Sequence, residues 1–217
     1  GGTNMALSKV DYNSLNVTPA ASKALKWNSG ADGFETGDVG GSLVLLATET
    51  ASSSATISFT SDIDSTYKVY LFKFTDLHPA TDNVQLMFNF SIDGGSNYNV
   101  SKAHTFVDSY HDEAGTDATL TYSTAHDMVG TGFAKFNFNV GNDNDQSASG
   151  YMHLFDPSST TFVKQYMAQQ NNSHNSDYTR NTYVAGYGNT TSAVDAVQFK
   201  FSSGNIDSGV IKMYGIT

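Results

Sequence analysis

Short runs of alternating apolar and polar residues recur from residue 42 to the end of the chain, without the 3.6-residue period of a helix between them. The last such region is typical: Phe199 and Phe201 fall on one face of a strand, and after a Ser-Ser-Gly-Asn turn residues 210–216 alternate again. We expect about eleven strands and no helix. The pattern predicts an all-β domain, a jelly-roll-like sandwich of two sheets, over residues 43–217.

The first 42 residues differ from the rest of the chain. They hold one of the three prolines, and the stretch 28–41 contains five glycines with little apolar periodicity. This composition predicts an extended N-terminal arm, residues 1–42, that attaches the protein to a partner or to other copies of itself and becomes ordered on binding. Its candidate anchors are Leu25, Trp27 and Phe34, because large apolar side chains, tryptophan above all, dominate protein interfaces.

The strongest turn signal is Asp93-Gly94-Gly95-Ser96, which lies between alternating runs at 84–92 and 98–107. Glycines tolerate the positive φ of tight turns, so we expect a hairpin here. Residues 91–98 resemble the Asp-box of sialidases, a motif that supports hairpins remote from catalysis. A sialidase would also need a cluster of arginines, and Arg180 is the only arginine of the chain. We therefore interpret the motif as structural.

Charge and cysteine content exclude several kinds of partner and chemistry. The formal net charge is −10, and the eleven Lys and Arg residues are scattered along the chain. Nucleic acids and anionic membranes are bound by clustered basic residues, so neither is expected as a partner. The sequence has no apolar run long enough to cross a bilayer, and we expect no membrane insertion. The absence of cysteine excludes disulfides and thiolate chemistry.

Patterns typical of catalysis and metal binding are incomplete. The six histidines never form His-x-His or His-x-x-x-His pairs, and residues 146–150 match only half of the Gly-x-Ser-x-Gly turn of serine hydrolases. We therefore expect no enzyme activity and no cofactor. Asp143 and Asp145 place carboxylates at alternate positions of a loop, as in Ca²⁺ sites, but no Glu completes an EF-hand. Two alternatives remain for this loop, a solvated turn, which we favour, and a weak Ca²⁺ site.

Aromatic residues are more numerous than one sandwich core needs, with fourteen Phe, twelve Tyr and one Trp. Tyr110, Tyr178 and Tyr187 lie close in sequence to Asn and Asp residues, where their rings could stack on sugars. The alternative, which we favour, is that these tyrosines occupy strand edges and subunit interfaces.

Several phrases of the chain resemble virion proteins of marine bacteriophages, in particular the fibre, appendage and capsid-decoration proteins of phages that infect cyanobacteria. The arm is similar to the attachment segments that open such proteins, at residues 6–12 and 17–35. The remaining phrases are similar to their β-domain and lie at residues 74–84, 93–96, 154–161, 189–194 and 203–216.

The resemblance implies a structural component of a virion, located at the particle surface. It implies other virion proteins as partners and a homo-oligomer, with a trimer favoured. In that role the arm docks and the β-domain projects outward. A carbohydrate-binding module, acting in host-receptor or glycan recognition, is the alternative. A hydrolytic depolymerase is a third possibility, and it would need paired carboxylates in a cleft.

Overall fold

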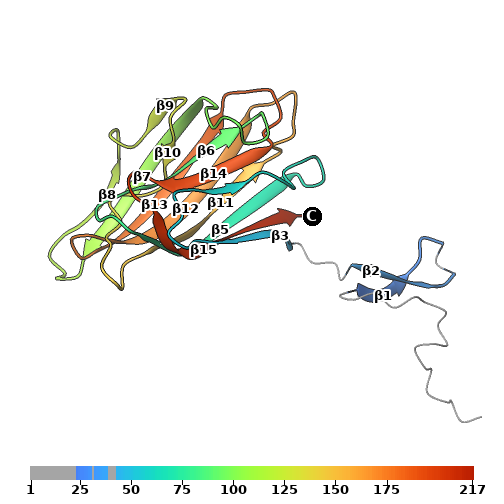
Figure 1. Ribbon diagram of the computed structural model, residues 1–217, viewed down its shortest axis with the longest axis horizontal. Helices are drawn as coiled ribbons and strands as arrows, with labels where there is room; N and C mark the ends of the chain where they lie inside the picture. The colour runs from blue at the N-terminus through green and yellow to red at the C-terminus, as the bar shows by residue number, and fades with distance from the viewer. Residues whose placement is uncertain (1–22, 31, 39–42) are drawn as a thin grey trace, which may run out of the picture. The chain divides into compact units, whose positions relative to one another are not determined.

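The computed structural model describes residues 23–30, 32–38 and 43–217. The chain divides into two units, the arm, Gly1–Ser42, and the head, Leu43–Thr217. Every strand pairing in the described residues is antiparallel (Figure 1). The prediction of an all-β protein is confirmed, and within these residues no helix could span a membrane.

The described part of the arm is a β-hairpin, whereas the sequence had suggested an extended segment. Strand β1 (Lys23–Trp27) pairs with β2 (Phe34–Asp38), and Trp27 lies opposite Phe34. The described residues between the strands form a turn, in which the Asn28 N–H donates to the Gly33 carbonyl at 3.0 Å and the Asn28 amide donates to Asp32 at 2.9 Å. Some of the glycines and acidic residues that had suggested an extended segment therefore belong to this turn.

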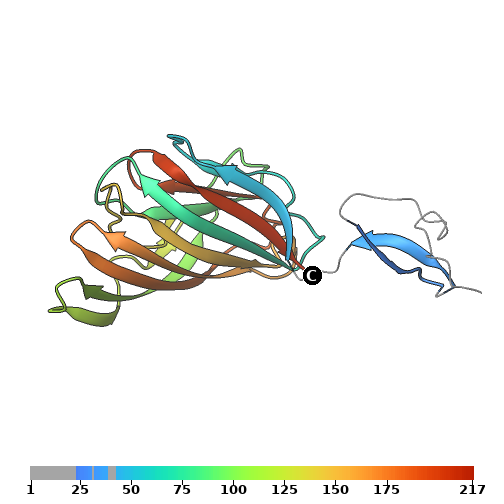
Figure 2. The same cartoon turned by 90° about the horizontal axis from the view of Figure 1, so that it is seen from below.

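The larger sheet of the head has nine strands, which lie side by side in Figure 2 from β3 in blue to β8 in green. Strand β5 is an interior strand of this sheet, as its apolar residues on both faces would suggest. In spatial order the strands are β3 (Leu43–Thr50), β15 (Ile206–Ile216), β5 (Val69–Pro79), β11 (Ala148–Phe155), β12 (Lys164–His174), β13 (Tyr178–Gly188), β7 (Lys102–Asp112) and β8 (Ala118–Tyr122), with β9 (Met128–Gly130) also on β7.

A second, four-stranded sheet packs against one face of the first. Its order is β10 (Ala134–Lys135), β6 (Leu86–Ser91), β14 (Ala196–Phe201) and β4 (Ile57–Phe59). The described residues thus form fifteen strands, two of them in the arm, where about eleven were expected from alternation. Strands as short as β9 and β10 leave no alternating pattern in the sequence, which accounts for part of the difference.

Aromatic rings fill the space between the two sheets. Phe72 and Phe74 of β5 approach Phe199 of β14, with ring centroids 5.4 Å and 5.1 Å apart. Phe88 of β6 approaches Tyr166 of β12 at 5.0 Å. Each of these rings is at least 97 % buried, and burying one such side chain stabilises a fold by about 1.5–3 kcal/mol. The core therefore fixes the two sheets face to face.

The hairpin expected around the Asp93 turn is wrong. Strand β6 belongs to the smaller sheet and β7 to the larger one, so the turn carries the chain between layers. Its side chains hold it in place: Ser91 Oγ donates to Asp93 Oδ1 at 2.7 Å, and the Asn97 N–H donates to the same oxygen at 2.8 Å. Gly94 and Gly95 have φ of 68° and 85°, the conformation that glycine adopts most easily. Turn chemistry was read correctly, but strand partners were not.

Candidate functional site

One face of the nine-stranded sheet packs on the smaller sheet, and the other face carries the candidate site. Along β12, Tyr166 and Ala168 point into the core and are buried, while Met167 between them is 58 % exposed. The same alternation on β13 buries Val184 and leaves Tyr183 50 % exposed. Large side chains thus lie on a sheet face that no described element covers.

Strand register brings these exposed residues into rows that cross the strands. In one row Tyr151 of β11 lies opposite Gln169, which lies opposite Tyr183, and the row continues to Val107 of β7 and Tyr122 of β8. A parallel row runs through His153, Met167, Ala185 and Thr105, and its last two residues, on β13 and β7, are small.

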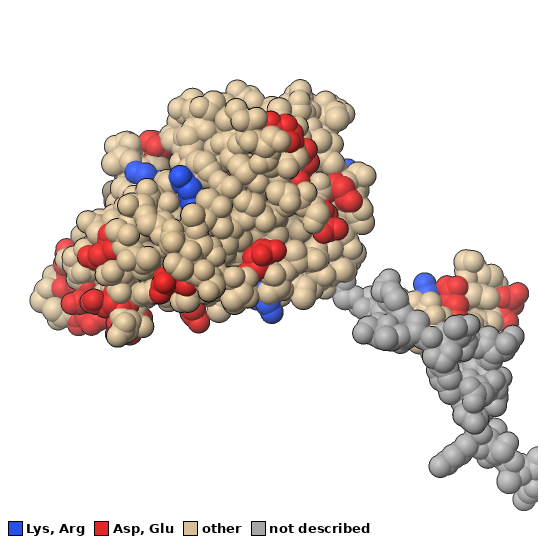
Figure 3. Space-filling view, in the orientation of Figure 1, with Lys and Arg blue, Asp and Glu red and all other residues tan. Residues whose placement is uncertain are grey.

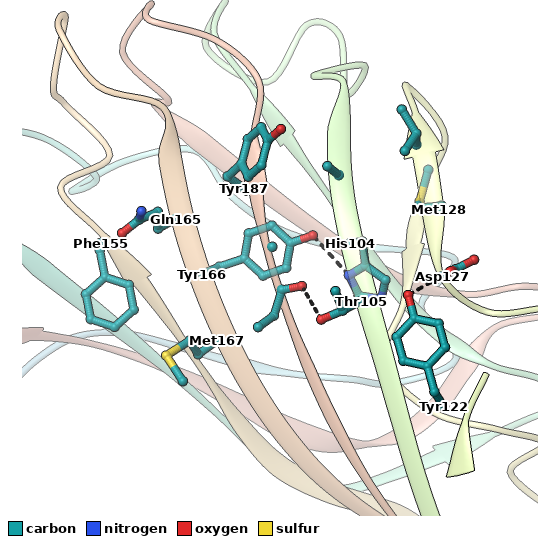
Figure 4. Close-up of a pocket in the computed structure, with 14 residues that line it drawn as sticks. His104, Thr105, Tyr122, Asp127, Met128, Phe155, Gln165, Tyr166, Met167 and Tyr187 are labelled. Carbon is teal, nitrogen blue, oxygen red and sulfur yellow. Dashed lines mark hydrogen bonds between the residues drawn. The ribbon is translucent and has the colours of Figure 1, made fainter. Parts of the chain in front are cut away.

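The small residues form the floor of a hollow between aromatic side chains (Figure 4). Two hollows, of about 640 Å³ and 480 Å³, share Thr105, Phe155, Met167 and Ala185, so they form one continuous depression. We call this depression the aromatic groove. Its aromatic walls are Tyr122, Tyr151, Phe155, Tyr183 and Tyr187. Binding sites for small molecules are typically of this volume and mostly apolar, with a few fixed polar groups.

Amide and hydroxyl groups orient the rings on one side of the groove. The Tyr151 hydroxyl donates to Gln169 Oε1 at 2.9 Å, and Gln169 Nε2 donates to the Tyr183 hydroxyl at 3.0 Å and to Asn181 Oδ1 at 3.0 Å. Gln169 therefore bridges two exposed tyrosines and holds both hydroxyls toward it. Rings fixed in this way lose little conformational entropy when a ligand stacks on them.

The opposite end of the groove contains a carboxylate and a buried histidine. The Tyr122 hydroxyl donates to Asp127 Oδ2 at 2.8 Å, and this hydrogen bond raises the pKa of Tyr122. Beneath the groove, His104 Nδ1 lies 3.0 Å from the Tyr166 hydroxyl (Figure 4). Burial lowers the pKa of His104 to about 4, so this imidazole is neutral at pH 7. Asp127 is the only acidic residue, and there is no basic one other than His104, among the residues that line the larger hollow.

The three tyrosines singled out from the sequence lie in two places. Tyr187 is a wall of the aromatic groove, whereas Tyr110 and Tyr178 lie on the opposite face of the sheet. These two rings pack edge to face, with centroids 5.2 Å apart, and line a separate hollow of about 210 Å³ together with Arg180. The structure therefore brings two of the three together and separates the third.

Arg180 dominates this second hollow. Its guanidinium carbon lies 4.8 Å from the Tyr110 ring centroid and 3.9 Å from that of Phe138, and an Arg180 nitrogen lies 2.6 Å from Asp108 Oδ2. Asp108 is fully buried, and its burial raises the pKa of its carboxyl group in spite of the arginine. Asp108 Oδ1 and Arg180 Nε have no hydrogen-bond partner, but both atoms are buried, so the hollow offers few accessible polar groups to a ligand.

The remaining predicted site residues lie outside both hollows. Asp143 and Asp145 are exposed on the loop before β11, and within the described residues no group of three or more His, Cys, Asp or Glu side chains is placed to hold a metal ion. In the arm, Trp27 stacks on Phe34 with centroids 4.5 Å apart, and register places Leu25 on the same face of the hairpin. Trp27 is 61 % exposed, and Leu25 and Phe34 are also exposed.

Sequence reasoning missed most of the aromatic groove. Tyr122, Tyr151, Phe155 and Tyr183 were not singled out, although a signal was present. Tyr151, His153 and Phe155 alternate on one face of a strand, and so do Tyr183 and Tyr187. In a sandwich only one face of each sheet packs in the core, so this many large residues on the other face indicate a further role.

Comparisons with known proteins do not identify the chain. No protein-family model, no curated protein and no solved structure matches it.

Proposed function

We propose that this protein is a non-catalytic attachment protein whose head binds a carbohydrate in the aromatic groove. The groove is the observation that carries the proposal, because it combines exposed rings with amide and hydroxyl groups at fixed positions. Sugars present apolar C–H faces and hydroxyl edges, so they fit a site in which aromatic faces and polar hydrogen-bonding groups alternate.

The dimensions of the groove favour a chain of sugars over a single one. Tyr151, Tyr183 and Tyr122 lie in one row that crosses five neighbouring strands, from β11 to β8. Neighbouring strands are separated by about 4.8 Å, so the row is roughly 19 Å long. Rings at intervals along such a row suit an extended oligosaccharide that lies across the strands.

The arm supports a second part of the proposal, attachment to a larger assembly. A two-stranded hairpin is marginally stable in water by itself, and this one exposes Leu25, Trp27 and Phe34 on one face. We propose that this face docks on a partner, and that the partner is another virion protein or another copy of the chain, with a trimer favoured. The jelly-roll-like head would then project from a bacteriophage particle as a tail fibre, appendage or capsid-decoration domain.

Glycan binding is tested with the full chain on an array of oligosaccharides, followed by calorimetry on any that bind. We expect Tyr151→Ala and Tyr183→Ala each to weaken binding about tenfold or more, since aromatic residues of this kind dominate binding energies. The Tyr110→Ala variant is the matched control, because that ring lies on the opposite face of the same sheet. If only the Tyr110→Ala control loses binding, the glycan binds in the hollow beside Tyr110 and Tyr178, and the assignment of the site to the groove is wrong.

Attachment is tested by deleting residues 1–42 and by the substitution Trp27→Ala in the full chain. We expect both proteins to keep a folded head, because every core residue that the structure describes belongs to the head, and to lose association with the particle or with other copies. Normal incorporation of the deleted protein would contradict the role of the arm. The bound polysaccharide should keep its length on incubation, and shortening would show instead that the head is an enzyme.

A further inference from the structure

Two lysines lie side by side at one end of the aromatic groove. Lys73 of β5 is directly opposite Lys212 of β15, and both side chains are exposed. The strand alternation places them on the same face as the groove, because Lys73 is also directly opposite Tyr151 of β11. The row described above therefore extends from Tyr151 onto a pair of positive charges.

This pairing has an energetic cost in the protein alone. Like charges directly opposite each other in a sheet repel, and the chain has only eleven Lys and Arg residues against a net charge of −10. Carboxylates are abundant, yet within the described residues neither Lys73 nor Lys212 has one within ion-pair distance. Lys68, by contrast, lies 3.0 Å from Asp156.

The charges of the groove are segregated along its length. The acidic residue among the groove-lining side chains, Asp127, lies at the far end beside Tyr122, while Asp76 on β5 is engaged with Ser149 Oγ at 3.4 Å. Acidic side chains also predominate on the face of the molecule drawn in Figure 3. A lysine pair in this setting attracts negative charge locally, although the protein as a whole repels it.

We propose that the carbohydrate is polyanionic, a chain of sugars that carries sulfate or carboxylate groups. Its sugar rings stack on Tyr151 and Tyr183, and its anionic groups lie over Lys73 and Lys212. This inference rests on the proposed function and adds the charge and the direction of the ligand. The row from Lys212 to Tyr122 crosses seven strands and is roughly 29 Å long. Because both lysines lie at its β15 end, the anionic groups of the ligand are held at that end.

The test compares sulfated and desulfated forms of one galactan by calorimetry with the full chain, at low and at physiological salt. A polyuronate is the third ligand and distinguishes carboxylate from sulfate. We expect the sulfated form to bind about tenfold more tightly at low salt, with an advantage that shrinks as salt screens the lysines. Tight binding of the polyuronate would show that the site recognises anionic groups in general, and weak binding would show that it prefers sulfate.

The deciding variant is Lys73→Gln combined with Lys212→Gln. We expect it to bind the sulfated galactan no better than the desulfated one, with the affinity for the desulfated form unchanged. Lys26→Gln combined with Lys200→Gln removes the same charge elsewhere, from β1 and β14, and should keep the preference. A preference for sulfate that survives in the Lys73 and Lys212 variant would overturn the charge inference alone. Absence of binding to all three polymers, with binding to a neutral oligosaccharide on the array, would overturn the charge inference and leave the proposed function standing. Absence of binding to every array member as well would overturn both.

Discussion

The two faces of the nine-stranded sheet carry similar residues in different surroundings. On β12, Tyr166 faces the smaller sheet and is 1 % exposed, and its neighbour Met167 faces the groove and is 58 % exposed. On the inner face the rings contact one another and stabilise the fold. No described element covers the outer face, so the same kinds of side chain form a hollowed surface there. Whether the second sheet covers a side chain, more than its residue type, therefore decides whether it is buried in the core or exposed in the groove.

The largest expected effect comes from removing a ring on the inner face. Phe199→Ala should lower the free energy of unfolding by about 3–5 kcal/mol, because Phe199 is fully buried among Phe72, Phe74 and Phe136. Tyr183→Ala on the outer face should change that free energy by less than about 1 kcal/mol. Urea denaturation measures both. Equal losses of stability would show that the two faces do not differ as described.

The buried ion pair is the second way to test the inner face. Arg180→Met leaves the Asp108 carboxylate buried without its partner, and we expect a loss of about 3–5 kcal/mol at pH 8. Without the guanidinium, the pKa of Asp108 rises further above its unfolded value. The folded variant therefore holds a proton that the unfolded chain releases, so its stability falls as the pH increases from 5 to 8.

Urea unfolding of the Arg180→Met variant at pH 5 and at pH 8 measures this dependence. Asp108→Leu combined with Arg180→Met removes both charges and is the matched control. We expect the double variant to recover much of the lost stability and to show a weaker pH dependence. If the Arg180→Met variant is equally stable at pH 5 and at pH 8, Asp108 stays charged in it and is stabilised by another group.

The sequence predicted the class of the fold well and its pairing poorly. Alternation within each strand is a local property, and it located nearly all the long strands of the head. Which strand pairs with which depends on contacts between distant residues, so the turn at Asp93 could indicate a reversal of the chain but not the change of sheet. The groove was missed for the same reason, because Tyr151, Tyr183 and Tyr122 come together only through register.

Protonation of buried His104 on the inner face should destabilise the fold in acid more than protonation of His153 on the outer face. Burial lowers the pKa of His104 to about 4 in the folded protein, against an ordinary value of 6.5. Between these values the unfolded chain binds a proton that folded His104 does not, so stability falls as the pH drops from 6.5 to 4. The loss is on the order of 3 kcal/mol and is absent above pH 6.5. His126, whose pKa burial also lowers to about 4, adds a change in the same direction.

Thermal unfolding across this pH range in wild type, His104→Gln and His153→Gln checks the expectation. His153 lies on the outer face, and burial lowers its pKa by less than that of His104. The His104 substitution should therefore flatten the profile, and the His153 substitution should leave it nearly as steep as in wild type. If His153→Gln flattens the pH profile more than His104→Gln does, the groove excludes water to a greater degree than its exposed walls suggest.

The smallest expected effect concerns a single hydroxyl on the outer face. Tyr151→Phe keeps the ring of the groove and removes the hydrogen bond to Gln169, which costs about 0.5–1.5 kcal/mol at most in stability. If the ring provides the stacking surface and the hydroxyl only orients it, ligand affinity should fall about two- to threefold, far less than in Tyr151→Ala. Calorimetry on the two variants with one ligand separates these contributions. A loss as large as that of the alanine variant would instead assign the Tyr151 hydroxyl a direct contact with the ligand, and the groove would then recognise its ligand chiefly by hydrogen bonding.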